Sequence, residues 1–241
     1  MAIRLISDLH LDASRPEIAR AFFIYLQRLP EDTEALYILG DFFEAWIGDD
    51  DDDAFHLQVQ EALKQATAKG LPIYFMHGNR DFMVGEDFCK NTGCSLINDP
   101  HIINYQGQRY LLMHGDSLCI DDQQYQQYRA QIRNPDMIAM LRAKPLAERR
   151  EIAKQLRTNS QEAASNKAED IMDVNQGEVE KQMREHGIHT LIHGHTHRPN
   201  VHNFDINGEP YRRIVLGDWN LLAWEIILTD KPELHAFATT E

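Results

Sequence analysis

The chain has 241 residues, of which 43% are hydrophobic and 26% charged, and its formal net charge at pH 7 is −14. This length suits one large domain better than two, and the composition is that of an ordinary soluble globular protein. So acidic a chain repels the phosphate backbone, which argues against nucleic acid as its main partner.

The N-terminal sequence MAIRLISDLH does not have the form of a signal peptide, and no apolar run reaches the roughly 18 residues that span a bilayer. We therefore expect a cytoplasmic protein. The cysteines Cys89, Cys94 and Cys119 form an odd set, which suits free thiols in a reducing compartment. Cys89 and Cys94 lack the second Cys or His pair that a structural zinc site needs.

Short apolar runs that end in glycine with His, Asp or Asn recur along the chain. They are IRLISDLH at 3–10, LYILGD at 36–41, IYFMHGNRD at 73–81, YLLMHGD at 110–116 and TLIHGHTH at 190–197. Each is typical of a buried strand followed by a tight loop. Helical stretches over Pro16–Arg28 and Ala54–Lys69 alternate with them, and VHNFDI, YRRIVLGDW and LLAWEIIL predict strands after residue 197. The alternation predicts an α/β fold.

Residues 122 to about 185 break this rhythm. The segment is rich in Gln, Ala, Arg, Glu and Met and lacks a β-branched run, so we expect helices inserted between two strand-end loops. Between Tyr125 and Arg157, eight basic residues stand against three acidic ones, which gives +5 inside a chain of −14. We expect residues 1–241 to form a single domain that carries this helical insertion.

Seven side chains with oxygen or imidazole donors stand at the ends of the predicted strands. They are Asp8, His10, Asp41, Asn79, His114, His195 and His197. Ligands of open α/β sheets bind beyond the carboxyl ends of strands, where successive loops converge. Carboxylate, amide and imidazole donors without thiolate suit Mn²⁺, Fe²⁺, Co²⁺ or Zn²⁺. One carboxylate can bridge two such ions, and Asp41 is our candidate for that bridge.

None of these residues, taken alone, would indicate a metal site. A lone His near a strand end is usually a satisfied core or surface residue, and a lone Asp after Gly is usually a turn residue. Five motifs in this order favour a metal site instead.

Together the motifs resemble the signature of the calcineurin-like metallophosphoesterase superfamily. The residues that match are Asp8-Leu9-His10, Gly40-Asp41, Gly78-Asn79-Arg80-Asp81, His114-Gly115-Asp116 and Gly194-His195-Thr196-His197. The resemblance implies a four-layer α/β/β/α sandwich. It also implies that Asp8, His10, Asp41 and His197 hold one ion, and that Asp41, Asn79, His114 and His195 hold a second.

Longer stretches resemble the UDP-2,3-diacylglucosamine diphosphatases, a family of the lipid A pathway in Gram-negative bacteria. They are YILGDFFEAWIGDDD, HGNRDFMVG, LLMHGDSLCIDD, IMDVNQ, LIHGHTHRP and RIVLGDW, and the match runs from about residue 4 to 219. The resemblance implies hydrolysis of UDP-2,3-diacylglucosamine to 2,3-diacylglucosamine 1-phosphate and UMP with two divalent cations, usually Mn²⁺. It further implies peripheral binding at the cytoplasmic face of the inner membrane. Nothing in the sequence demands more than a monomer.

In that family the inserted helices form a lid over the lipid, and polar side chains reach the glucosamine and the phosphates. The residues expected to bind substrate here are Asn79, Arg80, Asp122, Arg157, Ser160, Lys167 and His195. Arg80 offers a planar fork of donors to a phosphate oxygen, and Arg157 is an additional phosphate contact. Ala164 departs from the family, which often has Asn there, so no side-chain contact is expected from this position unless Asn166 replaces it.

We expect a metal-bridging hydroxide to attack the α-phosphorus directly. Asn79, Arg80 and His195 are the expected catalytic side chains, which stabilise charge on the phosphoryl oxygens. The leaving group is a sugar phosphate whose second pKa is about 6 by analogy with phosphoserine, so no general acid is assigned.

Two charged segments lie outside these motifs. The basic side of the insertion, with Arg149, Arg150 and Lys154, is expected to meet anionic lipid headgroups, and the apolar stripe of Met137, Met140 and Leu141 is expected to pack partly on the domain and partly on acyl chains. The acidic run 49–53 lacks the Gly and distal Glu of an EF-hand and is expected to be a solvated loop beside the active site.

Two alternative functions remain open. The first is another phosphodiesterase of the superfamily, which would share every metal ligand. The second is a non-catalytic scaffold on the same fold, but such scaffolds characteristically lose ligands and all seven are present here. Gly115-Asp116-Ser117-Leu118 also spells the block of the GDSL serine esterases. That block stands near the N-terminus in the esterases, with an Asp-x-x-His pair near the end, and this chain has neither arrangement.

Overall fold

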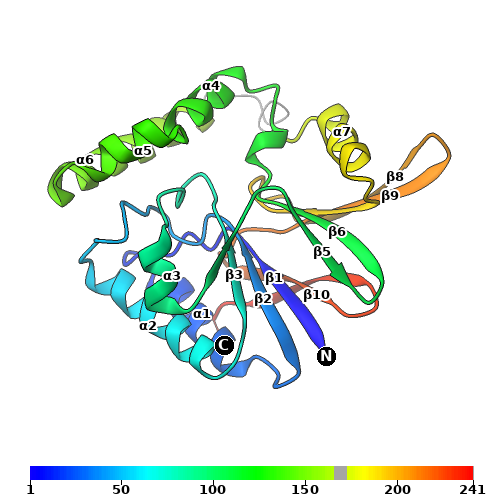
Figure 1. Ribbon diagram of the computed structural model, residues 1–241, viewed down its shortest axis with the longest axis horizontal. Helices are drawn as coiled ribbons and strands as arrows, with labels where there is room; N and C mark the ends of the chain where they lie inside the picture. Colours follow the sequence, from blue (N-terminus) through cyan, green and yellow to red (C-terminus); the bar gives the residue numbers. More distant parts are fainter. Residues whose placement is uncertain (166–172, 241) are drawn as a thin grey trace.

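Two β-sheets lie face to face at the centre of the structure (Figure 1). This computed structural model describes residues 1–165 and 173–240, with side chains for residues 1–158 and 173–240. Within those residues the first sheet has the strand order β11-β10-β1-β2-β3-β4, and the second has the order β5-β6-β7-β9-β8.

The first sheet consists of β1 (Ala2–Ile6), β2 (Thr33–Leu39), β3 (Ile73–Met76), β4 (Ser95–Ile97), β10 (Leu222–Leu228) and β11 (Pro232–Ala238). The second consists of β5 (His101–Tyr105), β6 (Gln108–Met113), β7 (Thr190–His193), β8 (Asn200–Ile206) and β9 (Glu209–Val215). Strands β1 to β4 run parallel to one another, and so do β6, β7 and β9. Parallel strands bring their carboxyl ends to one edge of each sheet.

Helices cover the outer faces of the sheets. They are α1 (Pro16–Arg28), α2 (Ala54–Ala68) and α3 (Glu86–Thr92) on the first sheet and α7 (Gln176–His186) on the second. Helix α1 begins at a proline, which the first turn tolerates, and it buries Ile18, Phe22 and Tyr25 along one face. Figure 1 shows α1, α2 and α3 on one side of the sheets and α7 on the other.

Alternation along the strands separates the apolar side chains into layers. On β2, Tyr37 and Leu39 belong to the cluster between the sheets, which also contains Leu112 of β6. The intervening Leu36 and Ile38 belong to the cluster beneath α1, α2 and α3. The predicted four-layer α/β/β/α sandwich is therefore confirmed.

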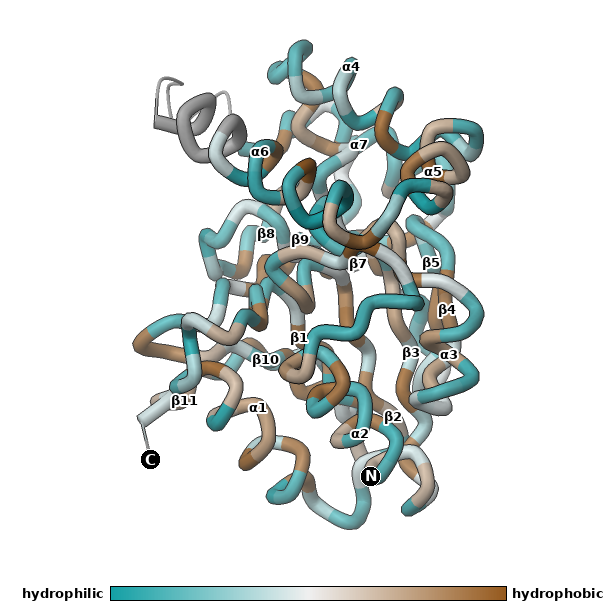
Figure 2. Tube along the Cα trace, turned by 90° about the vertical axis from the view of Figure 1, so that its left-hand side faces the viewer, coloured by the Kyte–Doolittle hydropathy of each residue, from teal (hydrophilic) through white to brown (hydrophobic). Residues whose placement is uncertain are grey.

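Three helices stand above the strand ends as a separate group. They are α4 (Gln123–Ile132), α5 (Pro135–Arg142) and α6 (Leu146–Ser165), and we call them the lid (Figures 1 and 2). Helix α7, in contrast, buries Val179 and Met183 in the cluster on the outer face of the second sheet. The segment predicted as one insertion over 122–185 thus divides into the lid and one helix of the sandwich, because α7 has an apolar face that the second sheet covers.

The lid packs on the domain through part of its apolar stripe. Leu141 is buried in the cluster of the first sheet, and Met137 packs against the same cluster. Met140 is 51% exposed. Among the residues that the structure describes, no helix is both long and apolar enough to span a membrane.

The acidic run after β2 is not a freely solvated loop, contrary to the sequence-based expectation. Asp49 accepts hydrogen bonds from the backbone N–H groups of Gly85, at 2.9 Å, and of Phe88, at 3.1 Å, which stand at the start of α3. Asp53 caps α2 by accepting from the N–H groups of Phe55 and His56. Carboxylates are stabilised at helix N-termini, where backbone N–H groups lack partners within the helix.

The acidic run 49–53 also binds helix α6 of the lid. Arg149 of α6 donates to the carbonyl of Ile47 and to the carboxylate of Asp50. Arg150 pairs with Asp51, at 2.8 Å, and with Asp52. These two arginines, expected to face lipid headgroups, therefore have partners within the protein, because the lid folds back over the acidic run.

Candidate metal centre

The predicted ligands lie in loops that follow five strands at the same edge of the two sheets. Asp8 and His10 follow β1, Asp41 follows β2, Asn79 follows β3, His114 follows β6, and His195 and His197 follow β7. The structure brings them together in two neighbouring groups, the first of Asp8, His10 and His197 and the second of Asp41, His114 and His195. Asn79 joins the second group through His114.

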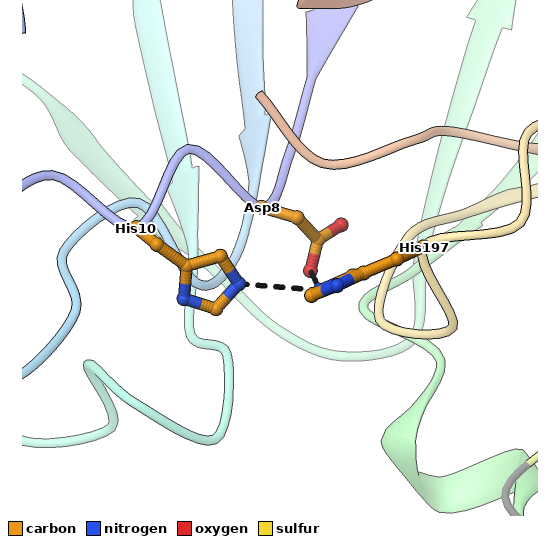
Figure 3. Close-up of side chains that lie close together, drawn as sticks. All are labelled: Asp8, His10 and His197. Carbon is orange, nitrogen blue, oxygen red and sulfur yellow. Dashed lines mark hydrogen bonds and ion pairs between the residues drawn. The ribbon is translucent and has the colours of Figure 1, made fainter. Parts of the chain in front are cut away.

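In the first group, three donor atoms converge from two loops (Figure 3). Nε2 of His10 lies 3.2 Å from Nε2 of His197, which in turn lies 3.4 Å from Oδ1 of Asp8. All three donor atoms lie within 4.8 Å of one another. Two imidazole nitrogens and a carboxylate that face a common centre form a donor set for a transition-metal cation.

In the second group, His114 is the central side chain. Its Nε2 atom lies 3.6 Å from Oδ1 of Asp41 and 3.0 Å from Oδ1 of Asn79. The other carboxylate oxygen of Asp41, Oδ2, lies 3.9 Å from Nε2 of His10 in the first group. One oxygen of Asp41 thus faces each group, which is the geometry that a bridging carboxylate needs.

Hydrogen bonds fix the orientation of these side chains. The Nδ1–H of His114 donates to the carbonyl of Leu39 at 2.9 Å, so Nε2 is left to bind a cation. The backbone N–H of His195 donates to Asp8 at 3.0 Å, and the backbone N–H of Arg80 donates to Oδ1 of Asp41 at 2.8 Å. Loops from different strands are therefore tied to each other through the carboxylates themselves.

Five predicted ligands have a left-handed backbone conformation. Their φ angles are 56° for Asp8, 49° for His10, 49° for Asp41, 68° for His195 and 55° for His197. For residues other than glycine this conformation costs roughly 1–2 kcal/mol each. In the part of the chain that the structure describes, the other such non-glycine residues directly precede glycines in β-hairpin turns. Strain gathered at one set of loops is typical of a functional site.

Two glycines allow the loops to approach each other closely. A Cβ atom at Gly78 would lie 2.1 Å from the backbone nitrogen of Asp41, and one at Gly194 would lie 2.2 Å from Oδ2 of Asp8. Neither position has room for a side chain unless the backbone of Asp41, or the side chains of Ser7 and Asp8, move. The packing of the centre therefore requires glycine there.

The charges of the centre shift two histidine pKa values in opposite directions. Burial lowers the pKa of His114, but the carboxylates of Asp41, Asp116 and Asp8 outweigh it and raise this pKa to about 9. Burial and the positive charge of His114 lower the pKa of His195 to about 4. A cation in the second group would take the place of the proton on His114 and find His195 already neutral.

The residues present fit a pair of divalent cations. The seven side chains supply carboxylate, amide and imidazole donors without a thiolate, as Mn²⁺ and similar ions accept. Their two carboxylates would neutralise only half the charge of two divalent ions. The centre would then attract an anion such as a phosphate.

A cavity of about 70 Å³ lies between this centre and the lid. Its apolar walls include Trp46, Ile47, Met83, Leu141, Ile152 and Leu156. Asn79, Arg80 and Arg157 also line it. Within the described residues, the buried Nε of Arg80 has no hydrogen-bond partner, and such an atom is normally satisfied by a ligand or by water.

The remaining predicted substrate residues occupy different places. Arg157 lines the cavity, but its Nε lies 3.0 Å from Oε1 of Glu44. Asp122 accepts a hydrogen bond from the backbone N–H of Tyr125 at 3.0 Å and so caps α4. Ser160 lies in α6, but its side chain falls outside those described, as does that of Ala164. Lys167 and Asn166 lie outside the described residues altogether.

No role was predicted from the sequence for two acidic residues that the structure places at the centre, Asp116 and Glu44. Asp116 is fully buried and accepts hydrogen bonds from Arg129 at 2.8 Å, Arg133 at 3.2 Å and Tyr125 at 3.1 Å, which fastens α4 to the loop of His114. Its place in the motif His114-Gly115-Asp116 was the available signal. Glu44 contacts His10, but its partners are distant in sequence and no local pattern marks it.

The sequence profile of the family described as calcineurin-like phosphoesterase matches residues 1–199. A Pseudomonas aeruginosa (strain UCBPP-PA14) protein named UDP-2,3-diacylglucosamine hydrolase is 52% identical over 226 residues, which cover 94% of each chain. A Chromohalobacter salexigens protein of the same name is 51% identical over 241 residues, which cover 99% of this chain and 98% of that protein. A third, from Marinobacter nauticus, is 50% identical over 93% of this chain and 92% of its own.

Proposed function

The chain belongs to the calcineurin-like phosphoesterase family, and from this membership we propose that it hydrolyses the diphosphate of UDP-2,3-diacylglucosamine, giving 2,3-diacylglucosamine 1-phosphate and UMP in the lipid A pathway. Relatives that share at least half of their residues with it over almost their whole length are named for this substrate. The observation that carries the proposal is the position of Asp41, one oxygen toward each donor group, beside an apolar cavity under the lid.

Each donor group is assigned one divalent cation, and Mn²⁺ is the proposed ion. Asp8, His10, Asp41 and His197 would hold the first, and Asp41, Asn79, His114 and His195 would hold the second. When bound, the cations supply a water of lowered pKa and neutralise charge on the phosphoryl oxygens. Nε2 of His114 accepts one of them only after losing its proton, so binding releases that proton to solvent.

Arg80 and its neighbours are proposed to orient the diphosphate. The Arg80 guanidinium faces the cavity with its Nε unpaired among the described residues, and a charge-assisted bond to a phosphate oxygen would satisfy it. Asn79 lines the same cavity, and His195 lies beside His114; the two complete the proposed catalytic side chains. The sugar phosphate is a good leaving group, so the residues need not supply a proton to it.

The lid and the cavity are proposed to receive the lipid part of the substrate. Trp46, Leu141 and Leu156 give the cavity apolar walls that suit acyl chains. Its 70 Å³ has room for only a handful of water molecules. Two acyl chains need more space, so part of each chain would extend beyond this cavity. The polar residues Asp122, Arg157, Ser160 and Lys167 are proposed to reach the sugar and the phosphates.

We place the protein as a monomer at the cytoplasmic face of the inner membrane, bound peripherally. The exposed side chains of Met140 on α5 and Lys154 on α6 support contact between the lid and an anionic bilayer. Arg149 and Arg150 contribute less to such a surface, because they pair with the acidic run.

A product assay in H₂¹⁸O tests the reaction and its site of attack together. Purified protein with Mn²⁺ should release UMP from UDP-2,3-diacylglucosamine, and the label should appear in UMP, because water attacks the α-phosphorus that carries uridine. Label in the lipid phosphate would place the attack on the other phosphorus. Turnover of a cyclic nucleotide in place of the lipid nucleotide would favour another phosphodiesterase of the family. Failure with both substrates would favour a scaffold.

A further inference from the structure

Glu44 joins a predicted metal ligand to the lid. Its Oε2 atom lies 3.0 Å from Nδ1 of His10, and its Oε1 atom lies 3.0 Å from Nε of Arg157 on α6. The carboxylate is 12% exposed, so both contacts lie largely out of solvent. A single side chain therefore contacts the first donor group with one oxygen and the lid with the other.

The backbone holds Glu44 firmly in this place. Its N–H donates to the carbonyl of Leu11 at 3.1 Å, and Leu11 also forms a β-bridge with Phe43. These bonds connect the loop after β2 to the loop that carries His10. The carboxylate can therefore act on His10 from a fixed point.

The ring of His10 makes the contact directional. Figure 3 shows one ring nitrogen of His10 facing His197 and the other facing away from the donor group. A cation bound at Nε2 of a neutral imidazole leaves the proton on Nδ1, which is the atom next to Glu44. Nδ1 of His10 lies at ion-pair distance from Glu44, although the pair is not aligned as a hydrogen bond within the described residues.

The two ends of the lid are fastened differently. Helix α4 is held by the fully buried carboxylate of Asp116, which binds two arginines. Helix α6 is held near the centre by Arg157, whose side chain is 38% exposed and whose Nη1 lies 3.8 Å from Asp12. The contact with Glu44 is thus the more easily exchanged one, and it leads directly to a metal ligand.

We propose that Glu44 is a positioning residue that couples cation binding at His10 to the placement of helix α6 through Arg157. A cation on Nε2 turns the Nδ1–H of His10 into a fixed donor to Glu44, and the fixed carboxylate then holds Arg157 and α6 over the centre. The inference rests on the proposed two-cation centre. It adds to that centre a path by which cation binding at His10 strengthens the contact of Glu44 with α6.

Two measurements on the full-length protein test this coupling. Mn²⁺ binding is followed by calorimetry, and hydrogen exchange is followed in peptides from residues 146–158 with and without saturating Mn²⁺. In the unmodified protein, two ions should bind and exchange in α6 should slow. Glu44→Gln should weaken the first ion by about 10- to 100-fold, the usual effect of losing a partner of a metal-bound His. At saturating Mn²⁺ it should also abolish the slowing in α6.

Two further variants separate the steps. Arg157→Gln should keep both affinities and lose the Mn²⁺-dependent slowing, because it removes only the lid end of the path. Asp52→Asn is the matched control: it removes a contact between Arg150 of the lid and the acidic run but none with His10, so both affinities and the slowing should persist. Glu44→Asp, which keeps the charge, should restore part of the first-site affinity.

The outcomes distinguish this inference from the proposed function. Unchanged affinity and unchanged slowing of exchange in Glu44→Gln would overturn the coupling while two bound ions uphold the centre. Loss of slowing in Asp52→Asn as well as in Glu44→Gln would also overturn it, because any lid contact would then suffice. Absence of Mn²⁺ binding in the unmodified protein would overturn the proposed function itself.

Discussion

Arg149 donates to the carboxylate of Asp50 through its guanidinium, at 2.7 Å from Nη1, and this pair fastens helix α6 of the lid to the acidic run after β2. Reversal of the charge in Arg149→Glu places a carboxylate opposite Asp50 and removes the hydrogen bond to the carbonyl of Ile47. Hydrogen bonds of charged groups contribute about 1.5–3 kcal/mol each, less where a partner is exposed. We expect thermal unfolding to show a melting temperature lower by about 5 °C. Lys154→Glu, which is exposed, should leave it unchanged.

The lid surface that meets lipid can be tested apart from stability. A double variant, Met140→Ser with Lys154→Glu, changes exposed side chains only. It should bind anionic liposomes more weakly in a flotation assay, because it loses both an apolar contact and a positive charge, the latter worth about 1 kcal/mol. Melting temperature and Mn²⁺ content should not change. Undiminished flotation would argue that another surface contacts the membrane.

Asp41 should be the least replaceable side chain of the centre. In Asp41→Asn the two donor groups lose their shared carboxylate, so we expect fewer than two bound Mn²⁺ ions and turnover reduced on the order of a thousandfold or more. His114→Ala should likewise abolish turnover. Asp230→Asn, at an exposed turn, is the control for loss of one acidic charge. Two tightly bound ions in Asp41→Asn would show that the carboxylate does not bridge.

Cation binding at the second group should depend on pH through His114. The pKa of His114 is raised from its usual 6.5 to about 9, so in the cation-free protein it carries a proton at neutral pH. The proton leaves when a cation binds, and affinity should therefore rise with pH, by up to about tenfold per unit, and level off above pH 9. Titrations at pH 6.5, 7.5 and 8.5, in buffers of different ionisation enthalpy, would measure the affinity and the proton released. An affinity independent of pH would contradict this assignment.

Arg80 is expected to act on the substrate and not on the cations. Arg80→Ala should lower kcat/KM by about 10- to 100-fold, because a charge-assisted hydrogen bond to phosphate contributes about 1.5–3 kcal/mol. Arg80→Lys should recover only part of the loss, since an ammonium group lacks the planar fork of donors. Calorimetry should find two bound Mn²⁺ ions in both variants. A weakened cation affinity would instead mean that Arg80 supports Asp41 through more than its backbone N–H.

Local patterns in the sequence predicted the α/β fold and the seven strand-end side chains, and the family resemblance added the four-layer arrangement. Buried parallel strands produce continuous apolar runs, and the loops after them carry His, Asp and Asn next to glycine. Strands β4, β5 and β11 have no such signal. Each lies at the edge of a sheet, where fewer side chains are buried, and β11 buries none of its residues fully.

Contacts between segments that are distant in the sequence could not be predicted from local patterns or from composition. The acidic run reads as a solvated loop because nothing near it in sequence shows that Arg149 and Arg150 will fold onto it. Glu44 is hidden for the same reason, since its two partners come from the loop after β1 and from the lid. The ligands of the centre can thus be predicted from local motifs. The side chains that support these ligands can be identified only once the complete fold is known.

The left-handed backbone of the ligands His195 and His197 opposes stability to activity. Replacing either of them by glycine would relieve a strained conformation and make the chain more robust to heat, while removing a donor atom from the centre. A variant library screened for thermal tolerance alone should therefore accumulate glycine at positions 195 and 197. The same library screened for turnover should retain every one of these ligands.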